Sequence, residues 1–179
     1  MLERRFADRF YFLDDVEAQP FREMWVLARC ALMSDCPLVR LAPLDTPRPD
    51  GYSRRDGLEF GAEVTEAMEP GRKRRLENWK PGEWREDPGS EWIRRAELIP
   101  VALANSLTKK KAIKYPSGTE LFIYLNIGEY GIRQREIEAE IMRQLDAPLG
   151  PFCEIYVLWK EKLFASSGKC WPRNEESQR

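Results

Sequence analysis

The segment from Asp50 to Glu66 constrains the fold of this chain most strongly, because it carries the pattern of a β-hairpin. Asp56-Gly57 is a dipeptide typical of a two-residue type I′ turn. After the turn, apolar and polar residues alternate, and a period of two is typical of a strand with one apolar and one polar face. The apolar positions are Leu58, Phe60, Ala62 and Val64, and the positions between them are Glu59, Gly61, Glu63 and Thr65. The sequence therefore predicts two antiparallel strands here.

This turn also predicts which residues face each other across the hairpin. Pairing outward from the two turn residues places Asp50 opposite Glu63, and Arg54 opposite Glu59. Paired side chains share one face, with Cβ atoms about 4.5–5.5 Å apart, so two facing carboxylates repel each other. A divalent cation between them removes the repulsion. Mg²⁺ prefers one or two carboxylates, water and phosphate oxygens, so the pair indicates phosphodiester hydrolysis, with the Val64 carbonyl as a further ligand.

The remaining patterns predict a mixed α/β fold. Apolar residues at helical spacing predict helices over 20–33 and 133–145, and a further helical region from Ser90 to Tyr115 that Pro100 interrupts. Apolar stretches predict strands over 38–43, 120–127 and 153–159, the second of them buried and central and the third the last strand. This order of elements is typical of a mixed central sheet flanked by helices.

The length of 179 residues predicts a single domain over 1–173. We expect its core over about 20–127, an insertion rich in Trp and Arg over about 69–90, and a helix-strand addition over 133–165. The polar segment over 174–179 is expected to be a disordered tail.

Composition excludes several classes of function. The chain has no histidine, which excludes Ser-His-Asp and Cys-His nucleophiles and histidine-ligated metals. Four cysteines without a C-x-x-C pair, no secretory signal and no apolar run long enough for a membrane helix indicate a reduced, cytoplasmic protein without membrane contact. The net charge of −1 leaves only local basic clusters, at 72–75 and 109–114, to bind a polyanion.

Pro49-Asp50, a twelve-residue spacer and Glu63-Val64-Thr65 resemble the signature of the PD-(D/E)XK, or restriction-endonuclease-like, nuclease superfamily. The order of elements over roughly 20–127 resembles the αβββαβ core of that family. The resemblance implies a DNA endonuclease in which Asp50 and Glu63 hold Mg²⁺ or Mn²⁺, with a further acidic residue at Glu23. It also implies a homodimer for an enzyme that cuts both strands.

The chain departs from that signature at one position, because Thr65 stands where the family has lysine. In some members the lysine lies on the following helix, where Lys110, Lys111 and Lys114 are the candidates, and of these we favour Lys111. Its role would be to orient the attacking water and to stabilise the charge on the pentavalent phosphate. Flanking phosphates would be bound by basic side chains of the two clusters. These are Lys110, Lys114, Arg72 and Arg74.

Two other hypotheses remain open. The chain could be a non-catalytic nucleic-acid-binding module on the same fold, which Thr65 favours, or an unrelated α/β protein that contacts partners through the Trp-rich segment over 69–92. Under the simplest interpretation Asp50 is a turn residue before Gly51, and Glu59 and Glu63 form a solvated strand face paired with arginines. The lysines over 109–114 would then be the exposed end of a helix.

Overall fold

The structure is a computed structural model that describes residues 19–34, 38–43, 48–69, 89–128, 131, 133–168 and 170–172. These residues form three helices and seven strands. In chain order they are α3 (Gln19–Met33), β1 (Leu38–Leu41), β2 (Gly51–Arg55), β3 (Leu58–Ala67), α4 (Gly89–Lys111), β4 (Thr119–Leu125), α5 (Gln134–Leu145), β5 (Glu154–Trp159), β6 (Lys162–Ala165) and β7 (Cys170–Pro172). Within this described part, no helix has the length and apolar character needed to cross a membrane.

All seven strands belong to one mixed sheet, in which they lie side by side in chain order. Neighbours from β1 to β3 and from β5 to β7 are antiparallel, whereas β3, β4 and β5 are parallel. Parallel neighbours need a crossover connection, and α4 and α5 supply the two crossovers. The predicted α/β class with a mixed central sheet is therefore confirmed, and the predicted central strand is β4, the fourth of seven.

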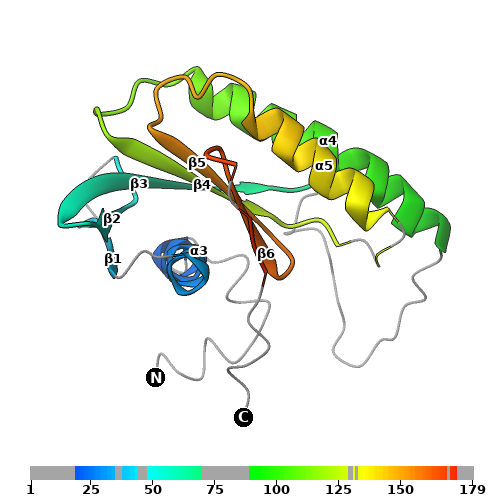
Figure 1. The fold of residues 1–179 in the computed structure, drawn as a ribbon, viewed down its shortest axis with the longest axis horizontal. Coiled ribbons are helices and arrows are strands. Elements are labelled where there is room, and N and C mark those ends of the chain that lie inside the picture. The colour runs from blue at the N-terminus through cyan, green and yellow to red at the C-terminus, as the bar shows by residue number, and fades with distance from the viewer. Residues whose placement is uncertain are drawn as a thin grey trace, which may run out of the picture.

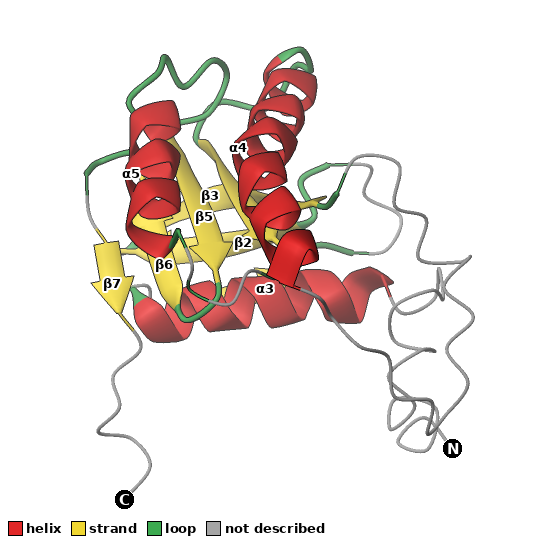
Figure 2. Cartoon of the chain, turned by 90° about the vertical axis from the view of Figure 1, so that its right-hand side faces the viewer, coloured by secondary structure: helices red, strands yellow, loops and turns green. Residues whose placement is uncertain are grey.

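The helices cover the sheet unequally (Figure 1). Helices α4 and α5 lie side by side on one face, and α3 is the one described helix that crosses the other face (Figure 2). Alternate residues of β4 enter two separate apolar cores: Leu121 and Ile123 face α4 and α5, whereas Phe122 belongs to the core beneath α3. Because β4 is buried on both faces, its sequence is apolar without alternation.

The hairpin has the predicted geometry. Asp56 and Gly57 both have positive φ, 49° and 77°, as a type I′ turn requires. Gly51 pairs with Ala62 and Arg54 pairs with Glu59, so the predicted register is confirmed along the ladder. The ladder ends at Gly51, so the predicted pair of Asp50 and Glu63 lies one step beyond the paired residues. Strand β3 then continues beyond β2 to Ala67, where β4 is the one described strand that pairs with it. Among the described residues, one edge of β3 is therefore left without a neighbouring strand from Glu63 onward.

Gly51 allows α3 to pack against the start of β2. A Cβ atom at this position would lie 2.6 Å from the Arg40 carbonyl oxygen and 2.8 Å from Leu27 Cδ1, both closer than packed atoms come. Leu27 is fully buried at this contact. The helix predicted over 20–33 is thus confirmed, and its packing brings it onto the hairpin beside Asp50.

Three expectations need correction. Helix α4 continues through Pro100 instead of being interrupted, because burial of its apolar side on the sheet offsets the hydrogen bond that a proline cannot donate. The same helix ends at Lys111 and does not reach Tyr115. The strand over 153–159 is not the last, since β6 and β7 extend the sheet beyond it.

The predicted insertion falls almost entirely outside the described residues, as does the tail.

We predict that Leu103→Ala lowers the free energy of unfolding by about 2–5 kcal/mol, because Leu103 is fully buried between α4 and the sheet. Leu32→Ala makes the same chemical change at a helical position that is 83% exposed, and should cost less than about 0.5 kcal/mol. Urea unfolding of both variants tests the assignment of the core. Equal losses would contradict it.

Candidate active site

Asp50 and Glu63 meet where β2 ends and β3 continues alone. Glu63 lies on β3 with its side chain on the α4 face, and only 3% of the residue is exposed. Asp50 directly precedes β2, and its Oδ2 accepts a hydrogen bond of 2.8 Å from the Val64 backbone N–H. The carboxylate of Asp50 thereby takes the place of the missing strand at this edge. Since the N–H and C=O of a strand residue point to the same edge, the Val64 carbonyl also points towards Asp50.

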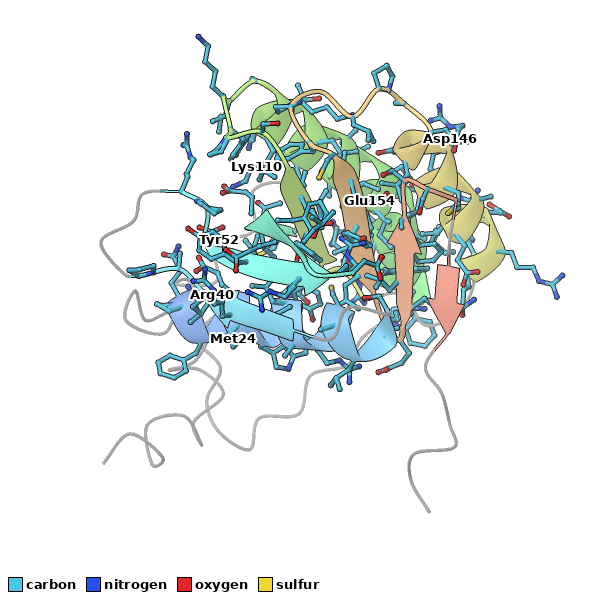
Figure 3. The ribbon with its side chains drawn as sticks, turned by 60° about the vertical axis from the view of Figure 1, so that its left-hand side comes forward. Met24, Arg40, Tyr52, Lys110, Asp146 and Glu154 are labelled. Atoms are coloured by element: carbon cyan, nitrogen blue, oxygen red, sulfur yellow. The ribbon has the colours of Figure 1, made fainter. Side chains whose placement is uncertain are left out.

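Lys110 and Tyr115 hold one oxygen of the Glu63 carboxylate. Lys110 Nζ, from the last turn of α4, lies 2.6 Å from Glu63 Oε1. The Tyr115 hydroxyl, from the connection between α4 and β4, donates to the same oxygen at 3.2 Å. In Figure 3, Lys110 lies on the same side of the view as Tyr52 of β2, whereas Asp146 at the end of α5 lies on the other side. The site draws on four segments of the chain: the residue before β2, strand β3, the end of α4 and the connection from α4 to β4.

The lysine at the site is Lys110, and the preference for Lys111 was wrong in geometry. Lys111 Nζ donates instead to the Pro148 carbonyl oxygen at 2.6 Å. Consecutive residues of a helix point about 100° apart, so only one of the two can face Glu63. Lys114 follows the end of the helix and is exposed. Arg72 and Arg74 lie outside the described residues.

The second oxygen of Glu63 has no partner. Glu63 Oε2 is buried, and within the described part of the chain nothing hydrogen-bonds to it. A buried carboxylate oxygen without a donor is costly, and its lone pairs are free for a cation. No three Asp, Glu, Cys or His side chains come close enough to hold a metal ion, in the part that the structure describes. A Mg²⁺ site here would use two carboxylates, the Val64 carbonyl and water, which is a set that Mg²⁺ accepts.

Burial and neighbouring negative charge change the acidity of this group of side chains. Burial raises the pKa of Asp50 to about 6, and the charges of Glu63 and Glu23 act in the same direction, against the Val64 N–H and Lys110. Burial also raises the pKa of Glu23 on α3, where the charge of Glu63 adds to the effect. Asp50 and Glu23, with Glu63 beside them, are a region of excess negative charge, which a cation would stabilise.

Glu59 and Glu63 have different environments, although both lie on the same face of β3. Glu59 is exposed and forms ion pairs with Arg40 at 3.1 Å and with Arg54 at 3.7 Å. It therefore fits the simple interpretation of a solvated, arginine-paired face. Glu63 does not, because α4 covers it.

Sequence reasoning missed two residues around Glu63. Burial and the charge of Glu63 raise the pKa of Tyr115 to about 12, so its hydroxyl remains a donor at neutral pH. The Tyr115 ring packs against Phe152, with centroids 4.8 Å apart, and Arg48 Cζ lies 5.4 Å from the ring centroid. The position of Arg48 two residues before Asp50 was the one signal in the sequence that could have identified it.

A second buried carboxylate, Glu120, lies on the opposite face of the sheet. It accepts a hydrogen bond of 2.6 Å from Ser53 Oγ and forms an ion pair with Arg55, which also donates to the Tyr156 hydroxyl. Both oxygens of Glu120 thus have partners, in contrast to Glu63. The group of Glu120, Ser53, Arg55 and Tyr156 joins β2, β4 and β5 as a polar contact within the sheet.

We predict that Asp50→Asn stabilises the protein at high pH, since asparagine can still accept the Val64 N–H bond without the buried charge. Folding raises the pKa of the Asp50 carboxyl from 3.8 to about 6. The free energy of unfolding of the wild type therefore falls as pH rises through that range. The gain should therefore be near zero at pH 4 and about 1 kcal/mol at pH 8, allowing for partial solvent screening. Urea unfolding at both pH values measures it. Asp146→Asn, at an exposed position, is the matched control.

No protein-family model, curated protein or solved structure matches this chain.

Proposed function

We propose that this protein is a metal-dependent phosphodiester hydrolase that cuts DNA, with Asp50, Glu63 and the Val64 carbonyl as ligands of Mg²⁺ or Mn²⁺. The observation that carries the proposal is the convergence of two carboxylates and a lysine from separate elements on one strand end, with Glu63 Oε2 buried and unpartnered. If this cluster served stability alone, we would expect a hydrogen-bond donor at Glu63 Oε2, as both oxygens of Glu120 have one.

The arrangement of the first six elements supports a restriction-endonuclease-like core. Helix α3, the antiparallel strands β1 to β3, helix α4 and the parallel strand β4 follow the αβββαβ order. The lysine that Thr65 replaces on β3 has a counterpart in Lys110 on the next helix. In this core, α5 and β5 to β7 are additions at one edge of the sheet.

Each protein side chain then has a distinct task. Bound Mg²⁺ would lower the pKa of a coordinated water and neutralise charge on the phosphate. Asp50 is fixed by the Val64 N–H, and Glu63 is fixed by Lys110 and Tyr115, so both carboxylates are oriented before substrate arrives. Lys110 Nζ carries three donors, of which Glu63 uses one, leaving donors for the attacking water or a phosphate oxygen.

A non-catalytic nucleic-acid-binding or protein-interaction module is the second candidate. One observation favours it: Lys110 already pairs with Glu63, so one positive charge balances this carboxylate without any metal ion. Such a module would bind DNA equally well with Mg²⁺ or with a chelator. Metal dependence of binding and cleavage therefore separates the two candidates.

We predict that Glu63→Ala abolishes Mg²⁺- or Mn²⁺-dependent nicking of plasmid DNA. Lys110→Met should lower the rate by about 10²–10³-fold, because a charged donor is lost from the reacting centre. Lys111→Met is the control, because it makes the same change at the neighbouring residue. Its rate should stay close to that of the wild type, since Lys111 Nζ donates to the Pro148 carbonyl oxygen and not to Glu63. The assay compares initial nicking rates of folded variants on supercoiled plasmid.

The opposite pattern, with Lys111→Met inactive and Lys110→Met active, would mean that the wrong lysine has been assigned. Absence of any metal-dependent nicking by the wild type, together with DNA binding that a chelator leaves unchanged, would replace the hydrolase by the binding module.

We also predict that Mn²⁺ binding weakens as pH falls through about 6, because the metal-free protein must release the Asp50 proton before the cation binds. Affinity should fall by about tenfold for each pH unit below that value. Calorimetric titration of Mn²⁺ between pH 5 and 8 measures the dependence. A flat profile would show that Asp50 is not a ligand, and Asp50→Asn should itself remove most of the dependence.

A further inference from the structure

We propose that Arg48, held on the ring of Tyr115, binds a backbone phosphate of DNA next to the phosphate that is cut. This inference rests on the proposed function and extends it, since it names the residue that would hold the substrate strand beside the carboxylates. Arg48 and Tyr115 belong to two different loops, one leading into β2 and the other into β4. Their contact therefore forms a small surface next to Glu63.

Tyr115 is a rigid support for this surface. One part of its ring packs on Phe152, with centroids 4.8 Å apart, and its hydroxyl donates to Glu63 Oε1 at 3.2 Å. Arg48 Cζ lies 5.4 Å from the centroid of the same ring. The guanidinium and the Glu63 carboxylate are therefore separated by a single tyrosine side chain. A ligand on Arg48 would lie beside the carboxylate site and not within it.

Arg48 is a cation with free donors. Its side chain is exposed, and in the described part of the chain its recorded contact is with the Tyr115 ring rather than with a carboxylate. Arginines elsewhere on the sheet are paired, Arg40 with Glu59 and Arg55 with Glu120. A guanidinium beside an aromatic ring keeps its N–H groups available, and its planar fork can bind two phosphate oxygens at once.

The charges around the site explain why a separate cation is needed. Glu23, Asp50 and Glu63 make the site acidic, and Lys110 is already held by Glu63. The chain as a whole has a net charge of −1, so its overall field does not attract a polyanion. The exposed Arg48, beside the Tyr115 ring, supplies a local positive charge for the phosphate backbone.

The test measures binding of a short fluorescein-labelled DNA duplex by anisotropy, with Ca²⁺ in place of Mg²⁺, over a range of salt concentrations. Arg48→Ala should weaken binding by about tenfold and reduce the slope of log K against log salt by about 0.9, the value for one lost phosphate contact. Arg48→Lys should keep the slope but recover only part of the affinity, because lysine lacks the planar fork. Tyr115→Leu, which removes the ring beside Arg48, should weaken binding in the same direction as Arg48→Ala.

The control is Arg135→Ala, which removes another exposed arginine, on α5. Helix α5 begins after the far end of β4, whereas Tyr115 precedes its near end, so Arg135 lies away from the site. If Arg48→Ala and Arg135→Ala have the same small effect, the Arg48 inference is overturned.

The two proposals fail separately. Metal-dependent nicking lost in Glu63→Ala, together with normal DNA binding by Arg48→Ala, keeps the hydrolase and rejects the phosphate site. DNA binding that depends on Arg48 without any nicking keeps the phosphate site and rejects the hydrolase. If the wild type neither binds nor cuts DNA, both are rejected, and Arg48 is only a stacked surface residue.

Discussion

The carboxylate of Glu63 is buried against α4, and most of what surrounds it follows from the cost of placing that charge away from water. A buried carboxylate is tolerated only with a counter-charge or donors beside it. Lys110 and Tyr115 supply these from the end of α4 and from the following loop, which fixes where the helix must end relative to β3. Helix α4 must in turn dock closely on the sheet, and its buried apolar side provides that packing. The position of one charge thus ties together the sheet, the crossover helix and the loop.

Much of the fold could be predicted from local patterns. The turn at Asp56-Gly57 determined the register of β2 and β3, because side-chain direction in a strand repeats every two residues and one turn sets the count. The continuity of α4 through Pro100 could not be predicted, since it depends on burial against a sheet that the helix sequence does not describe. Strands β6 and β7 were missed because strands of four and three residues carry little periodic signal.

The candidate site was predictable to the same extent. Asp50 and Glu63 follow from the hairpin register alone, and their proximity is confirmed by the bond from Val64 to Asp50. The choice between Lys110 and Lys111 depends on the rotation of α4 about its axis, which one residue changes by about 100°. Sequence spacing cannot fix that rotation when lysines are consecutive. The sequence predicts Tyr115 only as the end of a helical region. Its contact with Glu63 could not be predicted, because that contact depends on the path of a loop.

The distance along the chain between Glu63 and Lys110 has a consequence for how this protein becomes competent. The two residues are 47 positions apart, and the intervening segment includes α4 up to Lys109. A hairpin can form early from local contacts, but a contact of this length waits until the crossover helix has docked and β4 has paired. During synthesis or refolding, the paired carboxylates would therefore exist before the lysine reaches them. A chain that is only partly folded can present the acidic half of the site, but not the complete one.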